Sequence, residues 1–168
     1  MNAPPRIIVL MGPAGAGKTT IGVLLAHSLG WVFLDADDFH SPENVARMRR
    51  GIALTDAERA PWLDSIRGAL ERALANGERV VLACSALKEE YRRALVPAHA
   101  GDAVRFVYLR ADERVLRERL AHREGHYAGP QLLASQLQTL EEPSDALWVD
   151  ASQSPEEIVA RIRETLML

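Results

Sequence analysis

An eight-residue glycine-rich motif near the start of the chain restricts the possible folds more than any other part of the sequence. Residues 12–19, GPAGAGKT, fit the pattern G-x-x-x-x-G-K-[ST] and directly follow the apolar run Ile7–Met11. This context predicts a buried strand, a phosphate loop and a helix, with loop N–H groups and the helix N-terminus converging on a polyphosphate. Lys18 would then reach the β- and γ-phosphates, and Thr19 would place its hydroxyl on Mg²⁺. An ordinary glycine-rich turn is the alternative.

Length and composition favour one domain with a small partner. The chain has 168 residues, enough for one core and rather few for two, so we expect residues 1–168 to form a single domain. The net charge is −3 and no run of Lys or Arg occurs, which argues against binding to nucleic acid or a membrane surface. Cys84 is the only cysteine, so no intramolecular disulfide can form. Without a membrane-spanning run or a signal-peptide pattern, we expect a cytoplasmic protein.

Apolar segments alternate with helical patterns along the rest of the chain. After the first strand, further strands are expected at residues 31–34, 80–84, 104–109 and 147–149, the first two of these being buried. Capping boxes predict helices that begin after Thr55 and Ser154. Such alternation predicts a three-layer α/β/α fold with a five-stranded parallel sheet, which binds ligands at the carboxyl ends of its strands. Trp62 and Trp148 are assigned to the core.

Polar side chains follow the expected second strand, at the edge of the sheet where the phosphate loop should lie. Asp35 suits Mg²⁺ or a metal-bound water, because Mg²⁺ takes only one or two protein carboxylates. Asp37 suits a hydrogen bond to an acceptor hydroxyl and could remove its proton during phosphoryl transfer. Capping of the next turn is the alternative for Asp37 and Asp38. His40 could hydrogen-bond a polyhydroxy substrate, or be structural or exposed.

Two cations occur where either an anionic ligand or a neighbouring carboxylate could hold them. Arg59 lies one turn into the helix that follows Thr55, where the helix dipole disfavours a cation, so an anionic partner would explain it. An ion pair with Glu58 or Asp56 is the alternative. Lys88, just past the third strand, is a candidate for binding a substrate carboxylate or is a solvated helix residue.

Residues 122–135 are predicted to form a mobile lid. The apolar pattern weakens between Arg119 and Leu140, and residues 122–130 contain two glycines and a proline. Arg119 and Arg123 are four residues apart and therefore share one face of the helix that enters the lid. Their guanidinium groups could stack on adenine and neutralise charge on the transferred phosphate when the lid closes. A solvated helix face is the alternative.

Motifs outside the phosphate loop resemble those of the gluconate kinases, a family of short P-loop small-molecule kinases. The shared motifs are Asp35-x-Asp37-x-x-His40 with Asn44, Met48-x-x-Gly51-x-x-Leu54-x-Asp56-x-x-Arg59-x-Pro61-Trp62, Cys84-Ser85-Ala86-Leu87-Lys88 with Tyr91-Arg92, Arg123-x-Gly125-His126-Tyr127, and Ser135-Gln136 with Leu140-Glu141-Glu142-Pro143. They cover nearly the whole chain. The resemblance implies ATP-dependent phosphorylation of D-gluconate at its 6-hydroxyl, usually by a cytosolic homodimer.

The same resemblance implies a role for each matching residue. Around the ATP phosphates and Mg²⁺ it places Gly12, Gly15, Ala16, Gly17, Lys18, Thr19 and Thr20, with Asp35 on the metal side. At the sugar-acid pocket it places Asp37, His40, Arg59 and Lys88, with Arg123 and His126 in the lid and Arg119 near adenine. Lys18, Asp37 and Arg123 are the expected catalytic residues, Asp37 as the base. The family often has serines at Ala14 and Ala16 and Phe at Tyr127, but neither departure removes a required group.

Two other functions are compatible with a phosphate loop. A shikimate-like or other polyhydroxy-acid kinase would use the same scaffold with a different substrate pocket, and His40, Arg59 and residues 84–88 argue against it. A nucleotide-dependent switch or binding module would have no acceptor substrate. A GTPase switch predicts the motifs N-K-x-D and D-x-x-G, and neither occurs in the chain.

Overall fold

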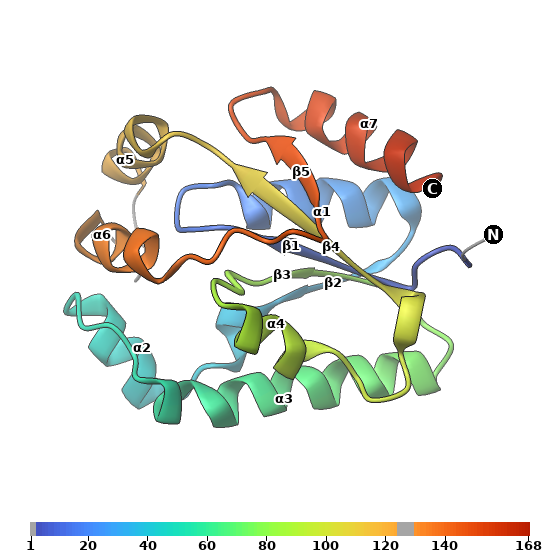
Figure 1. The fold of residues 1–168 in the computed structure, drawn as a ribbon, viewed down its shortest axis with the longest axis horizontal. Coiled ribbons are helices and arrows are strands. Elements are labelled where there is room, and N and C mark those ends of the chain that lie inside the picture. Colours follow the sequence, from blue (N-terminus) through green and yellow to red (C-terminus); the bar gives the residue numbers. More distant parts are fainter. Residues whose placement is uncertain (1–2, 124–129) are drawn as a thin grey trace.

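A five-stranded parallel sheet forms the middle of the molecule (Figure 1). The computed structural model describes residues 3–123 and 130–168. The strands are β1 (Ile7–Met11), β2 (Val32–Asp35), β3 (Val80–Ala83), β4 (Val104–Arg110) and β5 (Leu147–Asp150). Their spatial order is β2-β3-β1-β4-β5, and every neighbouring pair is parallel. The predicted five-stranded parallel sheet is confirmed.

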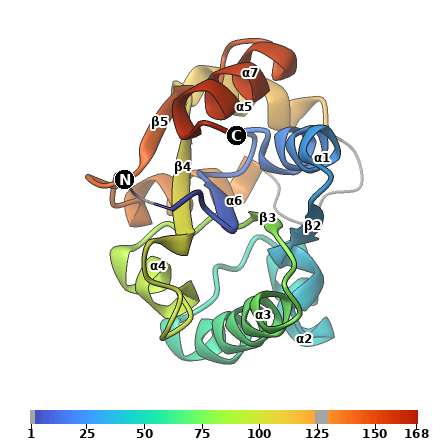
Figure 2. The ribbon, with the colours of Figure 1, turned by 90° about the vertical axis from the view of Figure 1, so that its right-hand side faces the viewer.

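Helices cover both faces of this sheet. The α-helices are α1 (Lys18–Leu29), α2 (Pro42–Arg49), α3 (Asp56–Ala75), α4 (Glu89–Leu95), α5 (Glu113–Ala121), α6 (Pro130–Thr139) and α7 (Pro155–Leu166), and two short 3₁₀ helices are η1 (Ala36–Phe39) and η2 (Gly101–Ala103). Figures 1 and 2 show α1, α5 and α7 on one side of the sheet and α2, α3 and α4 on the other. The three-layer α/β/α fold is therefore confirmed. Within the described ranges, no helix is long and apolar enough to cross a membrane.

The central strand β1 shows why two helical layers are needed. All five of its side chains are buried. Ile8 belongs to a core that includes Leu25 of α1, whereas the next residue, Val9, belongs to a core that includes Ile66 of α3. Successive side chains of a strand point to opposite faces, so an entirely apolar strand has to be covered on both. The phosphate loop therefore begins at the end of a strand that is buried on both faces.

The predicted capping boxes form and fix where two helices begin. Thr55 Oγ1 accepts a hydrogen bond from the backbone N–H of Glu58, and the Glu58 carboxylate accepts one from the N–H of Thr55. Ser154 and Glu157 make the same reciprocal pair before α7. Because α3 begins at a defined residue, its first turns bring Arg59 to a fixed place beside the sheet.

Two predictions about buried residues are wrong, and both concern strands at the edges of the sheet. Residues 31–34 were expected to form a buried strand, but β2 pairs only with β3, and Val32 is exposed. Trp148 was expected in the core, but 47% of its surface is accessible. Its ring packs edge-on against Tyr108 and its indole N–H donates to the carbonyl of Pro143 at 2.8 Å. An edge strand leaves one side open, which an apolar sequence does not reveal.

The region predicted to be a mobile lid contains a helix. From Pro130 to Thr139 the chain forms α6, and Leu132 and Leu133 are buried in the same core as α1 and α7. The prediction for residues 122–135 did not include this helix. Residues 124–129 lie outside the described ranges, so movement of a lid stays a prediction.

Candidate active site

Two glycines hold the phosphate loop against β4 and α5. Gly12 and Gly15 have φ angles of 146° and 87°. A Cβ atom on Gly12 would lie 2.9 Å from the carbonyl oxygen of Leu109, and one on Gly15 would lie 3.0 Å from that of Leu116. Both the positive φ angles and these close approaches exclude a side chain. The loop backbone is therefore fixed at the carboxyl end of the sheet.

Lys18 begins α1 and folds its ammonium group back onto the loop. Nζ donates a hydrogen bond to the carbonyl of Pro13 at 3.0 Å. The residue is partly accessible to solvent, yet protein atoms surround the ammonium group closely enough that burial lowers the pKa of Lys18, an effect that Asp37 opposes. A cation with little hydration beside loop N–H groups is suited to binding phosphate. This arrangement agrees with the role predicted for Lys18.

Thr19 and Asp35 supply oxygen atoms of the kind that Mg²⁺ prefers. Thr19 Oγ1 donates to Asp35 Oδ2 at 2.8 Å, and Asp35 Oδ1 accepts from the backbone N–H of Asp37 at 3.0 Å. The second bond makes Asp35 the N-cap of η1 and fixes its carboxylate at the end of β2. A hydroxyl and one carboxylate fit an ion that keeps several of its water ligands. The predicted metal residues are thus together, and their chemistry fits Mg²⁺.

Trp62 of α3 holds the segment that carries Asp37 and His40. Its Nε1 donates to the carbonyl of Ala36 at 2.7 Å, and its ring stacks on His40 with ring centroids 4.2 Å apart and planes 10° apart. Burial lowers the pKa of His40, and Asp37 opposes this effect. At neutral pH the imidazole is therefore uncharged and can both donate and accept a hydrogen bond. Trp62 is buried, as predicted, but its role beside His40 was not predicted.

Arg59 points to the same region from the first turns of α3. Its Nη1 donates to the carbonyl of Leu54 and to the Tyr91 hydroxyl, both at 2.9 Å, and that hydroxyl in turn donates to Asp56. The Asp56 carboxylate lies 3.8 Å from Arg59 Nη1 and 3.5 Å from Lys88 Nζ. Arg59 lines the cavity described next, whereas Lys88 is absent from its described lining. Arg59 is therefore placed for an anionic ligand, whereas Lys88 is connected to it only through their shared partner Asp56.

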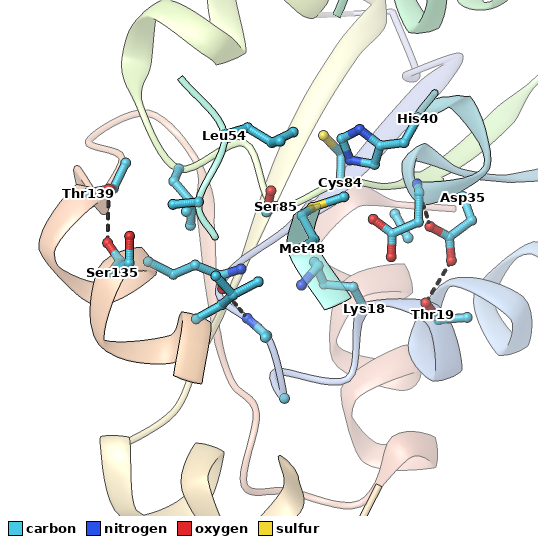
Figure 3. Close-up of a pocket in the computed structure, with 18 of the residues that line it drawn as sticks. Lys18, Thr19, Asp35, His40, Met48, Leu54, Cys84, Ser85, Ser135 and Thr139 are labelled. Carbon is cyan, nitrogen blue, oxygen red and sulfur yellow. Dashed lines mark hydrogen bonds between the residues drawn. The ribbon is translucent and has the colours of Figure 1, made fainter. Parts of the chain in front are cut away.

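These side chains line one cavity at the carboxyl ends of the strands, hereafter the main cavity (Figure 3). Its described polar lining residues are Lys18, Thr19, Asp35, Asp37, His40, Arg59, Ser85, Arg123, Ser135, Gln136 and Thr139. Figure 3 shows Thr19 and Asp35 at one end, Ser135 and Thr139 at the other, and Lys18 between them. Groups suited to phosphate, to a metal ion and to a polyhydroxy acid therefore share one space.

A second cavity lies beside the phosphate loop, next to α7. Its described lining residues are Gly15, Ala16, Gly17, Thr20, Ile21, Arg119, Arg123, Ala151, Gln153, Pro155 and Ile158. Arg119 donates to the carbonyls of Gly15 at 3.2 Å and Ala151 at 2.6 Å, which fixes its guanidinium group near the loop. A planar cation among apolar side chains suits an aromatic base. The placement agrees with the adenine role predicted for Arg119, but the contribution of residues 151–158 was not predicted.

Arg123 lines both cavities, but it lies beyond the end of α5 and not, as predicted, on a helix face shared with Arg119. The other predicted lid residue, His126, lies outside the described residues, as does Tyr127. Gln136 of α6 was quoted in a motif but given no role. Its Oε1 accepts a hydrogen bond from the backbone N–H of Ala14 at 2.7 Å, so α6 is connected directly to the phosphate loop.

Known proteins resemble this chain along most of its length. A family model described as an AAA domain matches residues 7–143. A gluconokinase of Gluconobacter oxydans is 45% identical, with 86% of this chain and 80% of that protein aligned. A probable gluconokinase of Mus musculus is 41% identical, with 96% of this chain and 98% of that protein aligned. A crystal structure of a gluconokinase from Sinorhizobium meliloti has a TM-score of 0.77 at 41% identity, with 97% of this chain and 96% of that chain covered.

The chain belongs to the gluconokinase family. The family resemblance drawn from the sequence motifs is thereby confirmed, and the chain is a kinase with a P-loop fold. In this gluconokinase fold, Gly15, Gly17 and Arg123 line both the main cavity and the second one. Two cavities that meet at a phosphate loop are what a kinase needs to bind a nucleotide and an acceptor at once. The roles of individual residues remain predictions.

Proposed function

We propose that this chain transfers the γ-phosphoryl group of ATP to the 6-hydroxyl of D-gluconate, forming 6-phospho-D-gluconate and ADP. The observation that carries the proposal is that Arg59, His40 and Asp37 line the same cavity as Lys18 of the phosphate loop. A guanidinium group suits the carboxylate of a sugar acid. A neutral imidazole and a carboxylate suit its hydroxyl groups. Membership in the gluconokinase family supports this choice of acceptor.

In the proposed mechanism, the chain's residues mainly position the two substrates. Lys18 and the loop N–H groups bind the phosphates, and Asp37 accepts a hydrogen bond from the acceptor hydroxyl, orients it and takes its proton as transfer proceeds. Arg123 neutralises charge on the transferred group. Thr19 and Asp35 would hold Mg²⁺, which supplies further neutralisation of the phosphate oxygens. Positioning and charge neutralisation account for most catalysis of this kind.

The second cavity is proposed to hold the adenosine part of ATP, with Arg119 over the base and Thr20 near the phosphates. Both residues line that cavity, on the α7 side of the loop. Lys88 is proposed to assist Arg59 through their shared partner Asp56, and His126 to act from the lid. A cytoplasmic homodimer is the proposed form of the protein, as the family resemblance implies.

A coupled assay of ADP release tests the proposed acceptor. The panel contains D-gluconate, shikimate, other sugar acids and D-glucitol, which has the hydroxyl chain of gluconate but no carboxylate. We expect fast release only with gluconate, and a far higher KM for glucitol because Arg59 has no anion to bind. The variant Arg59→Met should raise the KM for gluconate and leave that for glucitol nearly unchanged. Release that does not depend on gluconate, or a strict preference for another acceptor, would refute the proposal.

A further inference from the structure

Arg92 of α4 is the one charged residue that is buried in the described part of the chain, with 7% of its surface exposed. Its Nη1 donates a hydrogen bond to the carbonyl oxygen of Ala86 at 2.8 Å, and this bond is itself buried. Burying a guanidinium group is unfavourable unless its hydrogen bonds stabilise something in return. The structure around Ala86 indicates what this bond stabilises.

Ala86 has a left-handed backbone conformation, with φ 46°. Only one other non-glycine residue in the described ranges has a positive φ, Met167, which lies in the exposed end of the chain after α7. A residue with a Cβ atom disfavours this conformation because Cβ crowds the following carbonyl oxygen. Ala86 is only 2% exposed, so the strain lies inside the molecule and the surroundings have to maintain it.

The residues on either side of Ala86 connect three walls of the main cavity. The N–H of Gly12, at the start of the phosphate loop, donates to the carbonyl of Ser85 at 3.2 Å. The N–H of Glu141, just after α6, donates to the carbonyl of Leu87 at 2.8 Å. Ser85 and Leu87 also line the cavity themselves. The turn at Ala86 therefore sets where this wall lies relative to the phosphate loop and α6.

We propose that Arg92 is a positioning residue for the phosphoryl acceptor. By holding the carbonyl of Ala86, it keeps the left-handed turn, so that Ser85 and Leu87 stay in place in the wall of the main cavity. Arg92 is not among the residues that line the cavity, so it acts through Ala86 and not by contact with substrate. This inference rests on the proposed function, because it concerns the acceptor site of the same reaction.

A double-mutant experiment tests this role. Arg92→Met removes the hydrogen bond. We expect kcat/KM for gluconate to fall about tenfold, because a residue with a Cβ atom disfavours the left-handed conformation by about that factor. The KM for ATP should change less than about twofold, because ATP binding uses the loop and the second cavity. Ala86→Gly alone should behave like wild type. Combined with Arg92→Met, it should restore most of the lost kcat/KM, because glycine adopts a positive φ without the bond.

Outcomes for Arg92 and for the proposed function are distinguishable. A wild-type protein without gluconate kinase activity would overturn the proposed function. An active wild type whose Arg92→Met variant keeps its kcat/KM for gluconate would overturn only the role of Arg92. The role of Arg92 would also be overturned by a double variant that stays as impaired as Arg92→Met. An Arg92→Met variant whose KM for ATP changes as much as its kcat/KM for gluconate would overturn it as well. Thermal unfolding of each variant identifies the folded ones. If Arg92→Met does not fold, Arg92→Gln takes its place, since its shorter amide does not reach Ala86, and the same outcomes apply.

Discussion

The hydroxyl of Thr19 donates a hydrogen bond to Asp35 Oδ2 at 2.8 Å and thereby joins the first turn of α1 to the end of β2. In the sheet, β3 lies between β2 and β1, the strand that precedes α1. The bond brings the oxygen atoms proposed for Mg²⁺ together before any ion binds. Asp35 is held at its other oxygen by the N–H of Asp37, so the carboxylate cannot easily turn away.

Asp35→Asn should increase the Mg²⁺ concentration that gives half-maximal activity by at least about tenfold, because an amide is a weaker ligand than a carboxylate. The measurement is a Mg²⁺ titration of the initial rate at fixed ATP and gluconate. Asp38→Asn is the matched control, since Asp38 is exposed and absent from the described lining of the main cavity. An unchanged Mg²⁺ requirement in Asp35→Asn would remove this residue from the metal site.

Asp37→Asn should lower kcat by about 10²–10⁴-fold, the usual contribution of a general base, and leave the fold intact. The amide keeps the size of the side chain but cannot take a proton, so steady-state kinetics with saturating substrates measure that function. If Asp37 only orients the hydroxyl, the loss will lie at the low end of this range. Wild-type turnover in Asp37→Asn would exclude it as the base.

Arg123→Ala should lower kcat more than it weakens ATP binding, because Arg123 lines both cavities and is placed to act on the transferred phosphate. We expect a loss of at least about tenfold in kcat. Direct titration with a non-hydrolysable ATP analogue gives the binding side of the comparison. The control Arg114→Ala removes an exposed arginine that pairs with Glu118 in α5, the helix that precedes Arg123, and should be neutral. An effect confined to ATP affinity would place Arg123 in ground-state binding instead.

His40 should make the free energy of unfolding depend on pH. Burial lowers the pKa of His40 below the ordinary value of 6.5, so below that pH the unfolded chain binds a proton that the folded chain does not. The contribution to stability is complete above pH 6.5 and is lost as the pH falls from there toward the folded pKa. Urea unfolding on both sides of pH 6.5 should show this loss in wild type and a smaller one in His40→Phe, which keeps a ring to stack on Trp62. Equal pH dependence in the two proteins would contradict the assignment.

Local patterns were enough to predict the features that depend on short stretches of sequence. The phosphate loop follows from the fixed spacing of Gly12, Gly17 and Lys18 between a strand and a helix, and the start of α3 follows from the Thr55 capping box. The clustering of Asp35, Asp37 and His40 beside the loop follows from a general property of parallel sheets, whose carboxyl ends form one ligand-binding edge.

Features that depend on packing between distant segments could not be predicted in this way. Gln136 contacts Ala14 across 122 positions of sequence, and nothing near either residue indicates the contact. Trp148 looks like a core residue because its neighbours are apolar, but β5 is an edge strand. The helix α6 was missed because the glycines and the proline of residues 122–130 lead into it, although Leu133 and Leu137 have helical spacing and pack against one core.

The most direct test of the central claim is phosphorus NMR of a reaction that contains the protein, Mg²⁺, ATP and D-gluconate. We predict one phosphomonoester on the 6-hydroxyl of gluconate for every ADP formed. A parallel reaction with Lys18→Ala should show no phosphomonoester signal. Formation of ADP with inorganic phosphate alone, or of a phosphomonoester at another position, would contradict the account.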